Sequence, residues 1–224
     1  MLTSFGFCDR VEIFYLRGDF IFSLTHILLS IPGVFIAVAV HEYAKSLVAY
    51  RLGDTGVKEQ GRLTLNPIKH MDILGSIFMA VFGYGWANPV KLSPFSFQNR
   101  KKSLIIIFIT GFLTSLAVGG IFALAAHLYF DFMWQNLAFE DINFYILWGL
   151  SLAARLNIGF ALLNLLPIHP LNGSFLISGL TPETGVKIAQ AEKILQLILA
   201  LFIVFGGVNF FFGRIINIFL PIPI

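Results

Sequence analysis

Charged residues and cysteine are scarce in this chain of 224 residues. Asp, Glu, Lys and Arg make up 12% of it, roughly half their share in a soluble domain, whereas hydrophobic residues make up 57%. The single cysteine, Cys8, excludes an internal disulfide framework. The net charge is only +3, so we expect no basic surface for nucleic acid. These shortages exclude a disordered chain and an ordinary water-soluble domain, and they indicate an integral membrane protein whose main partner is the lipid bilayer.

Long uncharged runs predict the membrane helices. Residues 20–40 carry no formal charge, and the segment continues to residue 52 without a helix breaker, which makes it longer than the ~20 residues that cross the hydrocarbon. The helix is therefore expected to tilt, or to kink at Pro32 and protrude. Three further spans are expected at residues 103–130, 142–168 and 194–220. The apolar run 73–87 is too short for a span and suits a re-entrant segment.

The remaining segments complete the expected fold. The alternating stretch GRLTLNP, residues 61–67, predicts a small β-hairpin-like stretch. Residues 88–102 contain four basic residues and no acid, which predicts a cytoplasmic location, whereas the acidic loop 131–141 is expected outside. We expect one membrane-embedded domain over residues 1–224. Its fold class is an all-α integral membrane protein with about four transmembrane helices and one re-entrant or short hydrophobic segment.

Ionisable groups are costly inside a membrane, and three of them cluster in the stretch HEYAK. On a helix, His41 and Lys45 share a face and Glu42 lies one step round. This is the frame of H-E-x-x-H, in which two histidines bind zinc and the glutamate acts as general base, but Lys45 replaces the second histidine. Taken alone, the stretch is explained more simply by a Glu42–Lys45 ion pair beside a packing histidine.

A second unusual stretch ends the third expected span. Residues 164–173 place two prolines, two asparagines and a glycine at the end of an apolar run. The prolines free backbone groups, which lipid tolerates only against protein or a water-filled cavity. The pattern predicts a polar cavity at membrane depth near residues 167–173, with a plain helix end as the alternative. In mid-span, Arg155 is expected to face the bundle interior, toward Asn157 or a helix carbonyl.

Three stretches of the chain resemble the site-2 protease family of intramembrane zinc metallopeptidases, in its short bacterial form. They are HEYAKSLVAYRLGDTGVKEQGRLTLNPIKHMD, FGYGWANPVKLSPFSF and NLLPIHPLNG. The resemblance implies that His41 is a zinc ligand and that Glu42 is the catalytic residue, which activates water for attack on a peptide bond in the membrane. Lys45 stands where the family has its second histidine ligand, and Asn172 stands where it has its aspartate ligand. The family's A-G-P-x-x-N motif is reduced to TGFLTS at residues 110–115.

These substitutions affect the metal directly. A catalytic zinc site needs three protein ligands and an open position. An ammonium has no lone pair, and an amide oxygen suits harder cations better than zinc. We therefore predict a degenerate centre in which Lys45 pairs with Glu42, while Asn172 accepts from the ammonium and donates to the carboxylate. The alternative is a rescued zinc site made by His41, His169 and Asn172.

Three functions remain open at this point. The first is a pseudoprotease of the bacterial inner (cytoplasmic) membrane, weakened or inactive, which binds transmembrane protein segments as clients. The second is an active zinc-dependent intramembrane protease with an unusual ligand set, for which zinc is the cofactor. The third is a small transporter or channel, in which Arg155, Glu42 and Lys45 line a path; four or five spans leave little room for transporter repeats.

Overall fold

The structure is a computed structural model that describes residues 20–135, 141–180, 187 and 190–220. In this part of the chain the named elements are all helices. The long ones are α2 (Phe20–Arg51), α5 (Arg100–Gln135) and α6 (Asp141–Leu163). The shorter ones are α3 (Gly56–Glu59), η1 (Pro67–Lys69), α4 (Ile73–Phe82), η2 (Pro94–Ser96), α7 (Gly173–Leu180), α9 (Glu192–Val204) and α10 (Gly207–Asn217).

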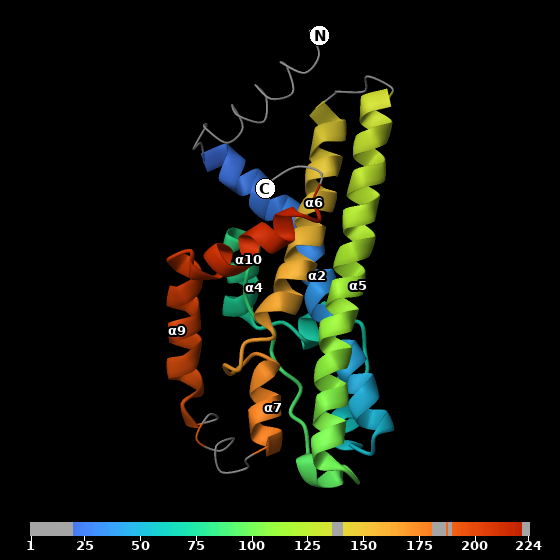
Figure 1. The fold of residues 1–224 in the computed structure, drawn as a ribbon, viewed down its shortest axis with the longest axis vertical. Coiled ribbons are helices and arrows are strands. Elements are labelled where there is room, and N and C mark those ends of the chain that lie inside the picture. Colours follow the sequence, from blue (N-terminus) through green and yellow to red (C-terminus); the bar gives the residue numbers. More distant parts are fainter. Residues whose placement is uncertain (1–19, 136–140, 181–186, 188–189, 221–224) are drawn as a thin grey trace.

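The three long helices pack together along the long axis of the molecule (Figure 1). Each is long and apolar enough to cross a membrane. They alternate in direction, so the start of α2 and the end of α5 lie at the same end of the bundle (Figure 1). At 36 residues, α5 is about 54 Å long, well beyond the ~30 Å of a hydrocarbon core. The expected all-α membrane fold is confirmed.

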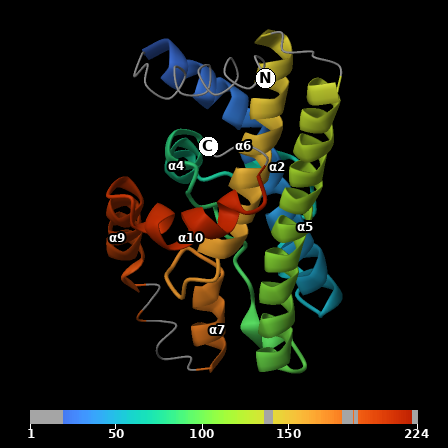
Figure 2. The ribbon, with the colours of Figure 1, turned by 45° about the horizontal axis from the view of Figure 1, so that its top comes forward.

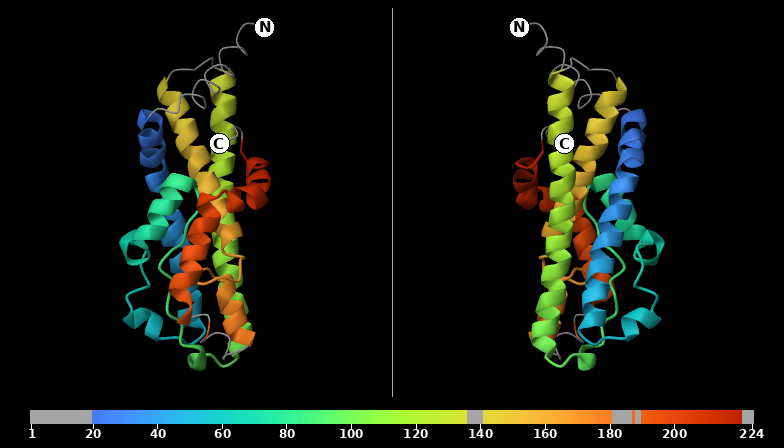
Figure 3. Two further views of the ribbon diagram at one scale, coloured as in Figure 1. Left: turned by 90° about the vertical axis from the view of Figure 1, so that its left-hand side faces the viewer. Right: turned by 90° about the vertical axis from the view of Figure 1, so that its right-hand side faces the viewer.

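Helix α4 is short and apolar, and the chain segments before and after it lie side by side. The Asp72 carboxylate accepts the Gly75 N–H at 2.8 Å and caps its beginning, while Gly83 ends it in the left-handed conformation, with φ 77°. The chain then runs back, so that Met71 pairs with Ala87 in an antiparallel bridge. The predicted short hydrophobic segment is therefore a ten-residue helix inside a closed loop, residues 70–90, which we call the α4 loop. In Figure 3, α3 lies on the side of α2 away from α5, and α4 lies against α2.

One expectation about local structure is wrong, and another is modified. Residues 61–66 form turns and irregular backbone and Pro67 begins η1, so that among the described residues the single bridge of the α4 loop stands in place of the expected hairpin. The last expected span is not one helix, because α9 and α10 meet at a bend of 60°. Gly206 lies at this break with φ 74°, a conformation that interrupts a helix. Helix α10 then crosses α6 (Figure 2), and the pair counts as a fourth span only if both helices are taken together.

Candidate functional site

Helix α2 and the loop between α6 and α7 bring four of the predicted site residues together. His41 and Glu42 are neighbours on α2, Lys45 lies one turn further along, and Asn172 lies just before α7. None of the four residues is more than 2% exposed. Such groups are stable in the interior only when each is paired and hydrogen-bonded.

The Lys45 ammonium is the centre of this cluster. Its Nζ donates to Glu42 Oε1 at 2.7 Å and to Asn172 Oδ1 at 2.5 Å. A third face of the ammonium lies 5.1 Å from the centroid of the Phe175 ring. The other carboxylate oxygen, Glu42 Oε2, accepts the backbone N–H of Val90 at 3.1 Å. The two hydrogen bonds predicted for the ammonium are confirmed, and both oxygens of Glu42 are occupied.

Lys45 fixes the orientation of the Asn172 amide and, through that amide, the tautomer of the His41 ring. Because an ammonium can only donate, the atom of Asn172 that faces Lys45 is the oxygen, and Nδ2 faces His41 Nε2. His41 Nε2 must therefore accept, so that Nδ1 carries the proton and donates to Ser115 Oγ at 2.7 Å. The prediction that Asn172 donates to Glu42 is wrong, because its amide nitrogen is engaged by His41.

Helix α5 contributes two residues that the sequence reasoning gave no role. Ser115 receives the His41 hydrogen bond, and it stands at the asparagine position of the reduced family motif, which was the available signal. A Cβ atom at Gly111 would lie 2.9 Å from His41 Cε1 and 2.9 Å from Lys45 Cδ. Only a glycine therefore lets α5 approach α2 this closely without a shift of the site.

The loop before α7 is held by a buried asparagine at the end of α6. Asn164 Nδ2 donates to the Phe160 carbonyl at 2.8 Å, and Asn164 Oδ1 accepts the backbone N–H of Asn172 at 3.1 Å. The Phe160 ring meets the His41 ring edge to face, with centroids 4.8 Å apart. These contacts hold the loop against the end of α6 and pair the backbone N–H of Asn172 inside the protein, as irregular backbone at membrane depth requires.

The returning segment of the α4 loop supplies the Val90 N–H. Two contacts clip it to the loop before α4: Asn88 N–H donates to the His70 carbonyl at 2.9 Å, and one Arg62 nitrogen donates to the carbonyls of Lys69 and Asn88 at 2.7 and 3.1 Å. The His70 ring is buried and donates from Nε2 to the Thr64 carbonyl at 2.8 Å. Burial lowers the pKa of His70, so the ring is held in its neutral form.

The residues at the family's ligand positions do not fit a zinc ion. The lone pair of His41 Nε2 is taken by the Asn172 amide, and Asn172 Oδ1 and Glu42 Oε1 are taken by the ammonium. His169 lies elsewhere, 3.3 Å from Glu192 at the start of α9. Across the described part of the chain, no three His, Cys, Asp or Glu side chains gather as a metal site would require.

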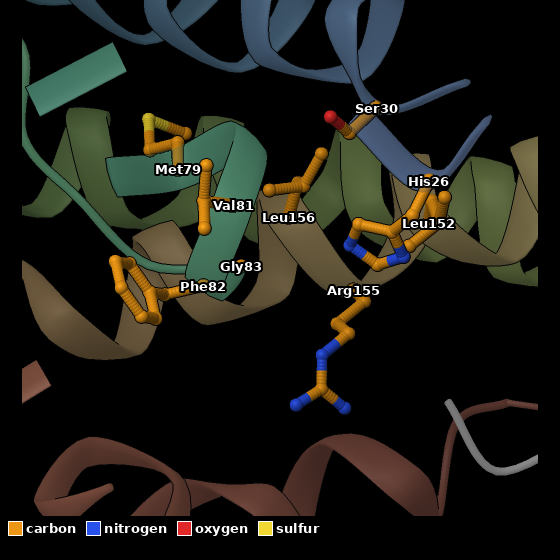
Figure 4. Close-up of a pocket in the computed structure, with 9 residues that line it drawn as sticks. All are labelled: His26, Ser30, Met79, Val81, Phe82, Gly83, Leu152, Arg155 and Leu156. Atoms are coloured by element: carbon orange, nitrogen blue, oxygen red, sulfur yellow. The ribbon is translucent and has the colours of Figure 1, made fainter. Parts of the chain in front are cut away.

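Arg155 belongs to a different region, nearer the start of α2. It lines a cavity of about 120 Å³ between α2, α4 and α6 (Figure 4), whose lining includes His26 and Ser30 but neither Glu42 nor Lys45. Its guanidinium points toward α10 and donates to Asn209 Oδ1 at 2.9 Å; of the two partners expected from the sequence, Asn157 is not bonded to it, and the helix carbonyl stays a prediction. The three charged groups proposed to line one transport path therefore do not line this cavity together.

Comparison with known proteins gives the family. Two bacterial proteins carry the name "Putative zinc metalloprotease". YwhC of Bacillus subtilis is 36% identical over 162 residues, which is 70% of this chain and 72% of YwhC. Rip2 of Mycolicibacterium smegmatis is 29% identical over 215 residues, which is 90% of this chain and 78% of Rip2. No family model and no solved structure matches the chain. On the identity and coverage of the YwhC match, the chain belongs to the site-2 protease-like zinc metalloproteases.

Proposed function

We propose that this protein is a non-proteolytic member of its family, which binds transmembrane segments of other proteins in the bacterial cytoplasmic membrane. The observation that carries the proposal is the Lys45 ammonium, bonded to Glu42 and Asn172 where the family places its metal. A general base needs a free lone pair directed at the water, and the Glu42 carboxylate has its two oxygens engaged by Lys45 and Val90. Membership of the family and the apolar helices support the membrane setting and the class of client.

The scaffold around the centre supports retained binding. The α4 loop, the close approach at Gly111 and the hydrogen bond from Asn172 N–H to Asn164 hold the elements around the centre in one ordered arrangement. We therefore assign the loss to hydrolysis and the retained function to the binding of a membrane segment.

The test uses the purified full chain in detergent with a panel of fluorescently labelled single-span peptides. Binding is followed by anisotropy and cleavage by mass spectrometry, with added zinc and with a chelator. We expect binding of at least one peptide, unchanged by chelator, and no cleavage product. Cleavage that the chelator and Glu42→Gln both abolish would show an active protease. Failure of every peptide to bind would refute the client-binding role.

A further inference from the structure

The buried centre, made of His41, Glu42, Lys45 and Asn172, has no net charge. Lys45 contributes one positive charge and Glu42 one negative charge, while the hydrogen-bond pattern leaves His41 and Asn172 uncharged. A zinc centre built on two histidines, an aspartate and the glutamate is neutral as well, because the ion's two charges meet two carboxylates. Exchanging zinc for an ammonium removes one positive charge, and exchanging aspartate for asparagine removes one negative charge.

We propose that Lys45 and Asn172 are one reciprocal unit that replaces a metal ion charge for charge. The ammonium is the resident cation of the centre, and the amide is the partner that this cation requires. The unit ties α2 to the loop before α7, and through His41 and Ser115 it ties both to α5. The centre therefore stays assembled whether or not zinc is present. This inference does not depend on the proposed client, since it concerns only what holds the centre together.

The geometry explains why neither residue can change alone. With histidine at position 45, the Glu42 carboxylate would be buried without a cation, and Asn172 Oδ1 would lose its donor. With aspartate at position 172, a carboxylate oxygen would face the lone pair of His41 Nε2, which now receives an N–H. Both single variants carry one excess negative charge at a site that is almost fully buried. Both changes together leave two such charges, which a divalent cation would balance.

The experiment compares the wild type with Lys45→His, Asn172→Asp and the double variant, all purified in detergent. Bound zinc is measured by elemental analysis, and the melting temperature is followed by tryptophan fluorescence with zinc and with a chelator. A surface pair serves as the matched control, because Lys101→His and Asn99→Asp make the same chemical changes at exposed positions away from the centre.

We expect the wild type to hold no stoichiometric zinc and to melt at the same temperature in chelator. Each single variant should melt about 5–10 °C lower and should not respond to zinc. The double variant should bind about one zinc per chain and recover several degrees on its addition, whereas the surface control should stay unchanged. If the double variant fails to fold, the melting temperatures of the wild type and of the single variants still test the proposal. A wild type that melts earlier in chelator, or single variants as stable as the surface control, would overturn the proposal.

Discussion

Removal of the Lys45 charge tests how the centre is held together. In Lys45→Met, the Glu42 carboxylate loses a partner at 2.7 Å while only 2% of the residue is exposed to solvent. Breaking a buried ion pair from one side costs about 3–5 kcal/mol. Glu42→Gln should cost a similar amount, because it leaves the ammonium with Asn172 as its hydrogen-bond partner. Measured alone, either loss would also fit a simple packing defect.

The double variant Lys45→Met with Glu42→Gln separates these explanations. It removes both charges, and its main cost is the Asn172 oxygen left without a donor, about 1–3 kcal/mol. Independent sites would give the sum of the single losses, about 6–10 kcal/mol, so a coupling of at least ~3 kcal/mol is expected. Unfolding free energies from denaturant titration in detergent, followed by tryptophan fluorescence, measure it, with exposed Lys91→Met as the control. Additive losses would refute the ion-pair account.

Three further predictions address the surroundings of the centre. Gly111→Ala should destabilise the fold by about 1–3 kcal/mol in thermal unfolding, because its Cβ would press on His41, whereas Gly120→Ala on the same helix meets no atom within 4 Å and should be neutral or slightly stabilising. Ser115→Ala leaves the His41 Nδ1 proton without its acceptor and should cost about 1–3 kcal/mol, while Ser115→Thr should restore part of the loss. Because burial lowers the pKa of His70, the unfolded chain takes up its proton first, and stability should fall as the pH drops below about 6.5; His70→Gln should flatten that part of the pH profile.

The features that could be predicted from the sequence depend on local spacing. The long apolar runs gave the spanning helices, and the i, i+3 spacing on α2 placed the Lys45 ammonium against Glu42. The bend at Gly206 was not foreseen, because an apolar run that contains a glycine pair reads as one span when hydropathy alone is considered. The strand expected in GRLTLNP failed because an alternating pattern specifies no partner for its edge.

The hydrogen-bond partners of the centre depend on contacts between distant segments. Ser115 lies 74 positions from His41, and Val90 offers a backbone N–H that carries no sequence signal. The choice of Asn172 between Glu42 and His41 follows from which atoms the packed helices place within reach. Residue types and helix spacing could name the members of the site, but only the packing of α5 and the α4 loop against α2 determined which atoms pair.

The closed α4 loop also determines how the chain is threaded through the bilayer. Because residues 70 and 71 meet residues 88 and 87, the loop contributes no crossing, and the end of α2 lies on the same side as the basic segment 88–102. With that segment in the cytoplasm, as its charge predicts, α2 begins on the outer side. A reporter enzyme fused ahead of α2 should then be active only if it folds outside the cell, and one inserted between α3 and η1 only if it folds in the cytoplasm. The ten-residue helix α4, by returning the chain to the same side, thus determines on which side of the membrane every other loop of this protein lies.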